Sequence, residues 1–153
     1  MDLVLWRHAE AHDAPAGGSD LARALTPKGI KQAMRVASWL NAHLPEDTRI
    51  CCSPARRTVQ TVEHLARAYQ LEPSVAPDAS PLALRALVGW PGQGGTTLVV
   101  GHQPTLGQVV AQLMGLQAAE CSIKKGAVWW LRHRLRDGVG QTVLVAVHNP
   151  DWS

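Results

Sequence analysis

Short apolar runs alternate with longer segments of helical periodicity along most of the chain. The runs at 3–6, 49–52 and 97–100 each contain three or four consecutive apolar residues, which is typical of strands buried on both faces of a sheet. Between these runs, apolar residues recur three and four positions apart, the spacing of a helix that covers a sheet. This alternation predicts a mainly parallel sheet with helices packed on it.

The segment that begins at Pro27 is the clearest predicted helix. Thr26 provides an N-cap and Pro27 occupies the first helical position. Apolar side chains follow at helical spacing, at Ile30, Ala33, Met34, Ala37 and Leu40.

Further helices are expected elsewhere, each after a proline. One should follow Ser53-Pro54 and run to about Tyr69, one should run from Pro81 to Val88, and one should follow Pro104 and end at Gly115. The prolines at 73 and 77 bracket a short segment that we expect to be extended.

Two strands joined by a turn are expected near the C-terminus. The runs at 127–131 and 142–147 flank Asp137-Gly138, and strands with a short connection pair antiparallel. The predicted fold class is therefore α/β, a three-layer α/β/α arrangement with a mainly parallel sheet and an antiparallel C-terminal strand. We expect residues 1–153 to form a single domain, since domains commonly contain about 100–200 residues.

The composition excludes several classes of protein. Apolar residues make up 46% and charged residues 18%, as in ordinary globular proteins, and no apolar run approaches the ~20 residues of a membrane span. The start of the chain lacks the features of a signal peptide, so we expect a cytoplasmic protein. The three cysteines form neither a disulfide framework nor a zinc motif. A net charge of +3 with scattered basic residues does not support nucleic-acid binding.

Polar residues follow three of the predicted strands directly. Arg7-His8 follows the first strand, Ser53 the second, and Gly101-His102 the strand at 97–100. Ligands of such sheets bind beyond the carboxyl ends of the strands, so these residues should converge at one edge.

The chemistry of this group suits a phosphoryl group. Arg7 and Arg57 offer planar, permanently charged guanidinium groups that match phosphate oxygens. His8 and His102 offer imidazoles, one able to attack phosphorus and the other able to donate to an oxygen. Helices that begin nearby would add free N–H groups. The set predicts a phosphate site with its own nucleophile and no need of a metal or cofactor.

Four motifs in order resemble those of the histidine phosphatase (phosphoglycerate-mutase-like) superfamily. Arg7-His8-Ala9-Glu10 resembles its RHG motif, with Ala in place of Gly, and Leu25-Thr-Pro-Lys-Gly29 matches L-T-x-x-G. The segment from Ser53 to Thr61 is similar to S-x-x-x-R-x-x-x-T and assigns the family arginine to Arg57 rather than Arg56. Gly101-His102 resembles the second histidine motif. The match covers residues 2–115.

The short chain and its Gly-His-Gln-Pro-Thr-Leu-Gly segment resemble the compact, SixA-type phosphohistidine phosphatases of this superfamily. The resemblance implies a compact phosphoglycerate-mutase-like fold. It also implies that neutral His8 attacks phosphorus and becomes phosphohistidine, which water then hydrolyses. Arg7, Arg57 and His102 would hold the transferring oxygens, and the substrate would be phosphohistidine in a protein.

The remaining site residues have more than one reading. Ser53 caps its helix, donates to phosphate, or does both, and Glu10 binds substrate, caps local structure or orients an arginine. For the proton donor, Asp78 is nearest to the usual position of the family acid, and Asp20, Asp13 and Glu10 are alternatives.

Two other functions compete with the leading one. The first is a phosphatase for small phosphomonoesters that uses the same site. The second is a catalytically silent phosphate-binding or interaction module, which the presence of both histidines and both arginines disfavours. The oligomeric state is left open by the sequence, and a monomer is compatible with it.

Overall fold

Strands and helices alternate as predicted in the computed structural model, which describes residues 1–92 and 94–152. The strands are β1 (Asp2–Arg7), β2 (Arg49–Cys52), β3 (Gln70–Leu71), β4 (Thr96–Gly101), β5 (Val128–Arg136) and β6 (Val139–His148). The α-helices of the described residues are α1 (Pro27–His43), α2 (Arg56–Glu63), α3 (Pro81–Val88) and α4 (Thr105–Leu113). Single turns of 3-10 helix, in the same residues, are η1 (Asp20–Ala22), η2 (Pro73–Val75) and η3 (Pro150–Trp152).

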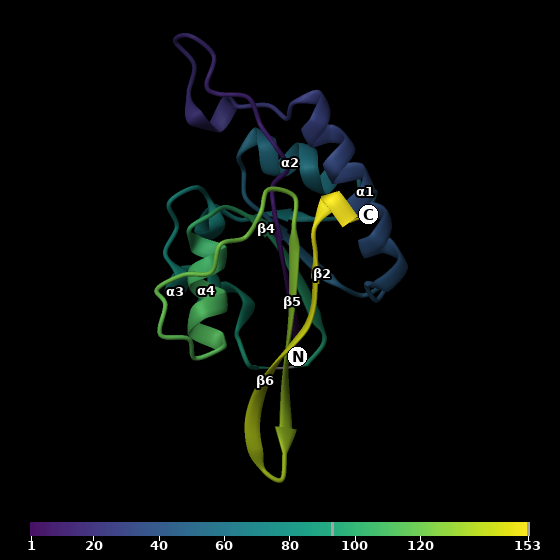
Figure 1. The fold of residues 1–153 in the computed structure, drawn as a ribbon, viewed down its shortest axis with the longest axis vertical. Coiled ribbons are helices and arrows are strands. Elements are labelled where there is room, and N and C mark those ends of the chain that lie inside the picture. The colour runs from purple at the N-terminus through teal and green to yellow at the C-terminus, as the bar shows by residue number, and fades with distance from the viewer. Residues whose placement is uncertain (93, 153) are drawn as a thin grey trace.

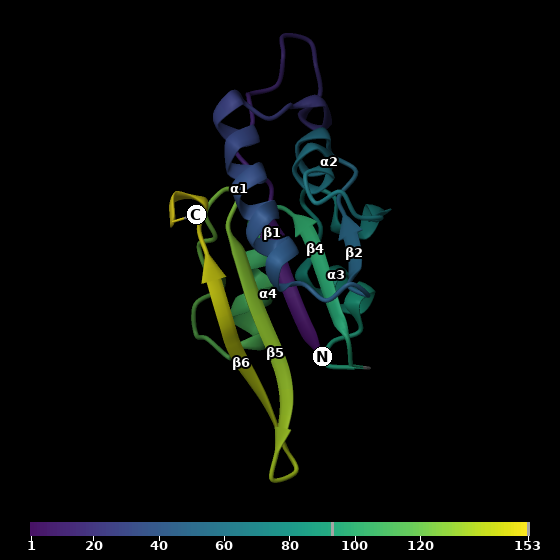
Figure 2. The same ribbon diagram turned by 90° about the vertical axis from the view of Figure 1, so that its right-hand side faces the viewer.

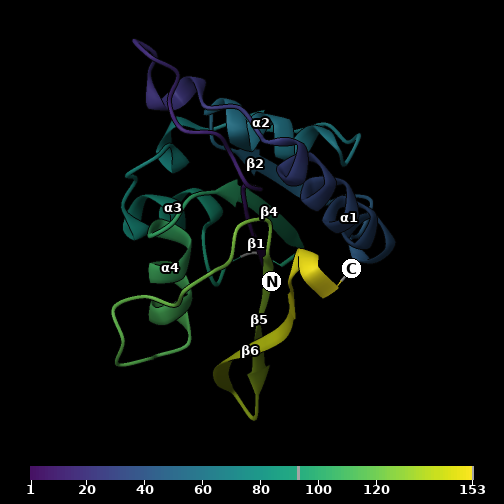
Figure 3. The ribbon, with the colours of Figure 1, turned by 45° about the horizontal axis from the view of Figure 1, so that its top comes forward.

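The strands form one sheet in the order β3-β2-β4-β1-β5-β6. The first four of these are parallel, β5 is antiparallel to β1, and β6 is antiparallel to β5. Helices α1 and α2 cover one face of the sheet and α3 and α4 cover the other (Figures 1, 2 and 3). The three-layer α/β fold predicted from the sequence is confirmed, with two antiparallel strands at its C-terminal edge.

Strand β1 shows why an uninterrupted apolar run indicates a central strand. Val4 and Trp6 point into the core beneath α1 and α2, whereas Leu3 and Leu5 point into the core beneath α3 and α4. All four side chains are fully buried. Successive side chains of a strand point to opposite faces, so a strand covered on both sides needs apolar residues at every position.

The predicted starts of α1 and α3 are confirmed. Thr26 Oγ1 accepts a hydrogen bond from the Gly29 N–H at 3.0 Å, and Ser80 Oγ accepts one from the Ala83 N–H at 3.1 Å. Each cap satisfies an N–H group that lacks a partner within its helix.

The second helix is shorter than its apolar spacing predicts. We expected it to reach about Tyr69, but α2 ends at Glu63 and Ala66 adopts a left-handed conformation with φ of 54°. Gln70 and Leu71 then pair with β2, which requires the chain to leave the helix. The segment at 73–77, expected to be extended, instead contains the turn η2. Pairing and packing with distant residues override local periodicity here.

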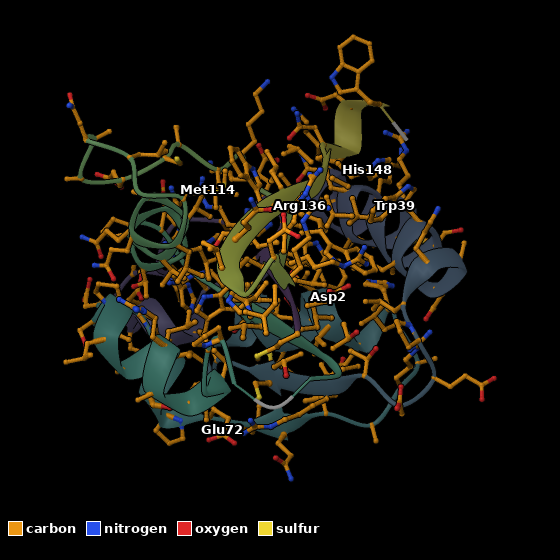
Figure 4. All side chains as sticks on the ribbon, turned by 90° about the horizontal axis from the view of Figure 1, so that it is seen from below. Asp2, Trp39, Glu72, Met114, Arg136 and His148 are labelled. Atoms are coloured by element: carbon orange, nitrogen blue, oxygen red, sulfur yellow. The ribbon has the colours of Figure 1, made fainter. Side chains whose placement is uncertain are left out.

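The C-terminal strands are longer than predicted, and their turn is as predicted. Asp137 and Gly138 have φ of 51° and 77°, the conformation that a two-residue hairpin turn requires. The hairpin extends beyond the rest of the sheet (Figures 1 and 2). At its other end, His148 stacks on Trp39 of α1 with ring centroids 4.5 Å apart, and the two residues are labelled next to each other in Figure 4. This contact ties the edge strand to the helix layer.

Candidate active site

A cavity of about 250 Å³ lies where β1 and β4 end and α2 begins. Arg7 is the last residue of β1, and it is paired with Gly101, the last residue of β4. His8 and His102 therefore leave neighbouring parallel strands at the same level, which is the convergence predicted from the sequence. The cavity is lined by Arg7, His8, Asp20, Arg23, Arg57, Pro77, Asp78, His102, Gln103 and Lys125.

The local structure around His8 selects the form of its ring that can attack. Its Nδ1 lies 2.7 Å from the carbonyl oxygen of Ala9, which can only accept, so the proton of a neutral ring is on Nδ1. The side chain is 6% exposed. Burial, followed by the charges of Arg57 and Arg7, lowers the pKa of His8 to about 4 against the opposing effect of the Ala9 hydrogen bond. At neutral pH, His8 thus carries a lone pair on Nε2.

His102 is held by Ser53 through its Nε2. The Nε2 atom lies 2.7 Å from Ser53 Oγ, and this hydroxyl, which accepts a hydrogen bond from the Ala55 N–H, can either donate its own hydrogen to Nε2 or accept one from it. Burial, then the charge of Arg57, lowers the pKa of His102 to about 3. When Ser53 donates to Nε2, the neutral ring carries its proton on Nδ1, the tautomer opposite to that of His8. The ring centroid of His102 lies 5.4 Å from that of His8.

Both arginines are fastened through their terminal nitrogens. Arg7 Nη1 donates to the carbonyl oxygen of Ile123 at 2.7 Å. Arg57 donates from Nη1 to the backbone oxygen of Asp20 at 2.9 Å and from Nη2 to its carboxylate at 3.1 Å. Burial and the charge of Arg57 lower the pKa of Arg7, which nonetheless remains charged at neutral pH. Two positive charges thus meet beside the histidines.

Three buried side-chain nitrogens lack a hydrogen-bond partner within the described residues, and all three belong to residues that line this cavity. They are Nε of Arg7, Nε of Arg57 and Nδ1 of His102. A buried donor without a partner costs about 1–3 kcal/mol, so such groups are rare unless a ligand satisfies them. An anion with several oxygens would satisfy all three, and a phosphoryl group offers three. The geometry fits a phosphate site.

Comparison with known proteins agrees with this geometry. Residues 3–81 match the family model described as histidine phosphatase superfamily (branch 1). The chain belongs to the histidine phosphatase superfamily. It is 32% identical to the phosphohistidine phosphatase SixA of Escherichia coli (strain K12) over 121 residues, which cover 74% of each chain. It is 38% identical to the uncharacterized protein Rv1276c of Mycobacterium tuberculosis (strain H37Rv) over 120 residues, again 74% of each.

The fold has a solved counterpart in the same branch of the superfamily. A structure from Agrobacterium tumefaciens, named as a candidate phosphohistidine phosphatase SixA, aligns with a TM-score of 0.82 over 97% of both chains at 22% identity. This likeness shows the fold. Together with the SixA relative, it makes this histidine phosphatase a SixA-like hydrolase with a phosphate-bearing substrate.

Thr61 connects the nucleophile to α2 in this histidine phosphatase. Its hydroxyl accepts from the backbone N–H of Ala9 at 3.1 Å and donates to the backbone oxygen of Arg57 at 2.7 Å. The loop after His8 and the helix that carries Arg57 are therefore held together. The methyl group of Ala9, which replaces the glycine of the RHG motif, is fully buried with Leu25.

Two motif glycines allow backbone segments to approach the site. A Cβ at Gly29 would lie 2.0 Å from the backbone oxygen of Glu10, two residues after the nucleophile. A Cβ at Gly107 would lie 1.9 Å from the backbone oxygen of Cys121. The chain then continues to Ile123, the partner of Arg7. Neither close approach is open to a residue with a side chain.

The structure separates the expected site residues into those that line the cavity and those that do not. Arg57 is buried in the site, whereas Arg56 is exposed, as the motif alignment predicted. Asp78 and Asp20 line the cavity.

Ser53, Glu10 and Asp13 lie outside the cavity lining. Ser53 contacts His102 instead, and it accepts from Ala55 one residue before α2. The Glu10 carboxylate accepts from the hydroxyl of Thr26, the N-cap of α1, at 2.7 Å, which is a local contact of the kind that the sequence left open for Glu10. Asp13 is exposed in the first loop.

Sequence reasoning missed Arg23, Gln103 and Lys125, which also line the cavity. Arg23 lies just before the Thr26 N-cap and Gln103 follows His102, so their nearness to motif residues was the available signal. Lys125 comes from the irregular segment after α4, where the sequence carries no such signal.

Other features of the described residues do not alter this assignment. A larger hollow of about 490 Å³ lies at the opposite end of the sheet, with Asp47 and Arg49 as the charged side chains of its described lining and no histidine among it. No three His, Cys, Asp or Glu side chains group so as to hold a metal ion in the part of the chain described. None of the helices in residues 1–92 and 94–152 is long and apolar enough to cross a membrane.

Proposed function

We propose that this histidine phosphatase removes the phosphoryl group from phosphohistidine in proteins, through a covalent intermediate on its own His8 and without a metal or cofactor. The three unpartnered donors around a neutral imidazole carry this proposal. A site that only bound phosphate would have no use for an imidazole whose Nε2 lone pair is kept unprotonated.

In the first step, Nε2 of His8 attacks phosphorus in line with the bond to the substrate imidazole. The new P–N bond forms as the old one breaks, and the substrate nitrogen leaves with a proton. The N–H groups of Arg7, Arg57 and His102 each hold an oxygen of the phosphoryl group. Their positions are set before the substrate arrives, so they stabilise the transition state without rearrangement.

In the second step, water attacks the phosphoryl group on His8. The P–N bond breaks, inorganic phosphate leaves, and the lone pair returns to Nε2. Asp78 is our choice for the group that supplies a proton to the leaving nitrogen and later accepts one from water. It lines the cavity and holds a left-handed backbone with φ of 67°, a conformation that is uncommon for a residue other than glycine.

Two observations support a phosphohistidine substrate. The cavity is small, about 250 Å³, which suits a phosphoryl group with a single ring attached. The E. coli relative at 32% identity is itself named as a phosphohistidine phosphatase. Protein-bound phosphohistidine can reach such a site because Asp20, Asp78 and Lys125 on its lining are exposed.

The test compares a phosphohistidine peptide with p-nitrophenyl phosphate and with sugar phosphates, each in the presence and absence of EDTA. We expect the highest kcat/KM on the phosphohistidine peptide, with no effect of EDTA. His8→Ala should abolish both turnover and labelling by substrate phosphate, whereas His64→Ala, an exposed histidine at the end of α2, should leave both unchanged. Full activity of His8→Ala would overturn the covalent mechanism, and a preference for sugar phosphates would overturn the substrate.

We propose a monomer, which is compatible with the sequence, as the active unit. The cytoplasmic location expected from the sequence is also part of the proposal. Cys51, Cys52 and Cys121 are free thiols, which suits a reducing compartment. Size-exclusion chromatography of the active enzyme checks the first point, and fractionation of cells checks the second.

A further inference from the structure

Arg57 is a buried arginine whose terminal nitrogens are both taken up by one exposed residue. Its side chain is 5% exposed, while that of Asp20 is 55% exposed. Asp20 accepts one hydrogen bond through its backbone oxygen and one through its carboxylate, so it meets Arg57 at two points. Two contacts fix the plane of a guanidinium group as well as its position. The Nε–H of Arg57 is left without a partner inside the site.

The same carboxylate is engaged on its other side. Oδ1 of Asp20 accepts from Arg23 Nη1 at 3.2 Å, and Arg23 Nε donates to the backbone oxygen of His12 at 2.7 Å. Burial alone would raise the pKa of Asp20, but the hydrogen bonds and charges of Arg23 and Arg57 lower it below its ordinary value. Asp20 is therefore held in its ionised form, in which its carboxylate is a counter-charge for both arginines.

A counter-charge is needed at this position when no phosphate is bound. The charge of Arg57 acts unfavourably on the charge of Arg7 and on the protonated forms of His8 and His102. An arginine in this setting lowers its free energy by turning toward water, and its long side chain has rotamers that allow it to do so. The two contacts with Asp20 oppose that movement.

We propose that Asp20 is a positioning residue for the phosphate-binding arginine. Asp20 clamps the terminal nitrogens of Arg57, and the Nε–H is thereby presented to the phosphoryl group. The inference rests on the proposed function, because it assumes that Arg57 binds the phosphoryl group. The first loop thus affects phosphate affinity through Arg57, without a contact of its own with phosphate.

The test is phosphate binding by variants of Asp20, with inorganic phosphate as the probe in a ³¹P NMR titration. Asp20→Ala should weaken binding about tenfold, the effect of one charge-assisted hydrogen bond that is lost or misaligned. Asp20→Asn keeps the backbone acceptor and one side-chain oxygen, so its loss should be smaller. Asp13→Ala makes the same change in the same loop without touching Arg57, and it should bind phosphate as the wild type does.

Three further measurements separate positioning from other roles. Asp20→Ala should lower kcat/KM on p-nitrophenyl phosphate without changing how kcat/KM depends on pH. Loss of a general acid would instead remove the fall of kcat/KM at high pH. In an Arg57→Ala background, Asp20→Ala should have no further effect on phosphate binding. Thermal unfolding should show that Asp20→Ala is folded, since Asp20 is an exposed residue.

Wild-type phosphate affinity in Asp20→Ala, or a full additional loss in the Arg57→Ala background, would overturn the proposal. Loss of the fall of kcat/KM at high pH in Asp20→Asn would also overturn it. Failure of the proposed function would give different results: His8→Ala would remain active, or another substrate would be preferred. The phosphate titrations would still show whether Asp20 positions Arg57.

Discussion

The cavity has two walls that are built in different ways. The core wall, which we define as Arg7, His8 and His102, is fastened to buried groups: the backbone oxygens of Ile123 and Ala9 and the hydroxyl of Ser53. The loop wall, Asp20 and Arg23, is fastened mainly to itself and to Arg57 through charges. The side chains of Asp20 and Arg23 are 55% and 26% exposed.

This difference separates what the two walls control. Partners in the core cannot move without disturbing packing, so the tautomers and positions of the two imidazoles are as stable as the fold. Ion pairs near solvent contribute little to folding and are screened by salt. The loop wall can therefore affect ligand affinity while the free energy of unfolding hardly changes. Arg57 connects the two walls, because its helix packs on the core and its counter-charge, Asp20, is on the loop.

The strongest test of the core wall is Arg7→Ala. Removal of a preorganised donor to the phosphoryl oxygens should lower kcat/KM by about 100- to 1000-fold. Arg7→Lys should recover little of this, because an ammonium group cannot contact both the Ile123 oxygen and a phosphoryl oxygen in one plane. Steady-state kinetics on p-nitrophenyl phosphate measures the loss. A loss below tenfold would show that Arg7 does not hold the transferring group.

As the pH falls, protonation should affect the histidines of the core wall before the carboxylate of the loop wall. His8 and His102 have ordinary pKa values of 6.5 that fall to about 4 and about 3 in the folded protein. The unfolded chain thus binds more protons than the folded one between about pH 6.5 and 4, and the free energy of unfolding should decrease as the pH falls through that window. Urea unfolding at several pH values measures this decrease, and His8→Gln should reduce it. A free energy of unfolding that does not change across the window would contradict the buried neutral imidazoles.

Activity should follow the same protonation. Protonated His8 has no lone pair on Nε2, so kcat/KM should be constant on the acid side of neutrality and fall about tenfold per pH unit below about pH 4. A fall that begins near pH 6.5 would mean that the ring of His8 is as accessible to protons as an exposed histidine.

Gly107→Ala tests the support behind the core wall. The new methyl group would lie 1.9 Å from the backbone oxygen of Cys121, so the segment that carries Ile123 must shift. We expect the free energy of unfolding to drop by about 1–3 kcal/mol and KM to rise as Arg7 loses its alignment. Gln108→Ala on the same helix is the matched control for both measurements. An unchanged KM in a folded Gly107→Ala protein would separate Arg7 from this segment.

The smallest effect is expected from the loop wall, in Arg23→Ala. This change removes one of the two partners of the Asp20 carboxylate and leaves the contact between Asp20 and Arg57 in place. We expect a loss of at most about 1 kcal/mol in stability or ligand binding, which shrinks further in about 0.5 M NaCl. A loss as large as that of Arg7→Ala, or one that salt leaves unchanged, would mean that Arg23 itself contacts the substrate.

Several local features were predictable because local chemistry controls them. Thr26 was recognised as an N-cap and Asp137-Gly138 as a hairpin turn, and each needs only residues close in sequence. The choice of Arg57 over Arg56 followed from motif spacing. The predicted end of α2 was wrong. Apolar spacing is compatible with a longer helix, and only the pairing of β3 with β2 shows where the helix must stop.

The sequence by itself determined which residues lie at the carboxyl ends of the strands, and so it brought Arg7, His8 and His102 into one site. Only the tertiary structure decided how each of them is used. The Nε2 of His102 is held by Ser53, 49 residues away, and Nη1 of Arg7 by a carbonyl 116 residues away. Asp20, which by sequence was one of several candidate acids, accepts two hydrogen bonds from Arg57. The physical reason is that burial follows from local patterns, whereas a hydrogen-bond partner depends on which distant backbone or side chain is brought within 3 Å by packing.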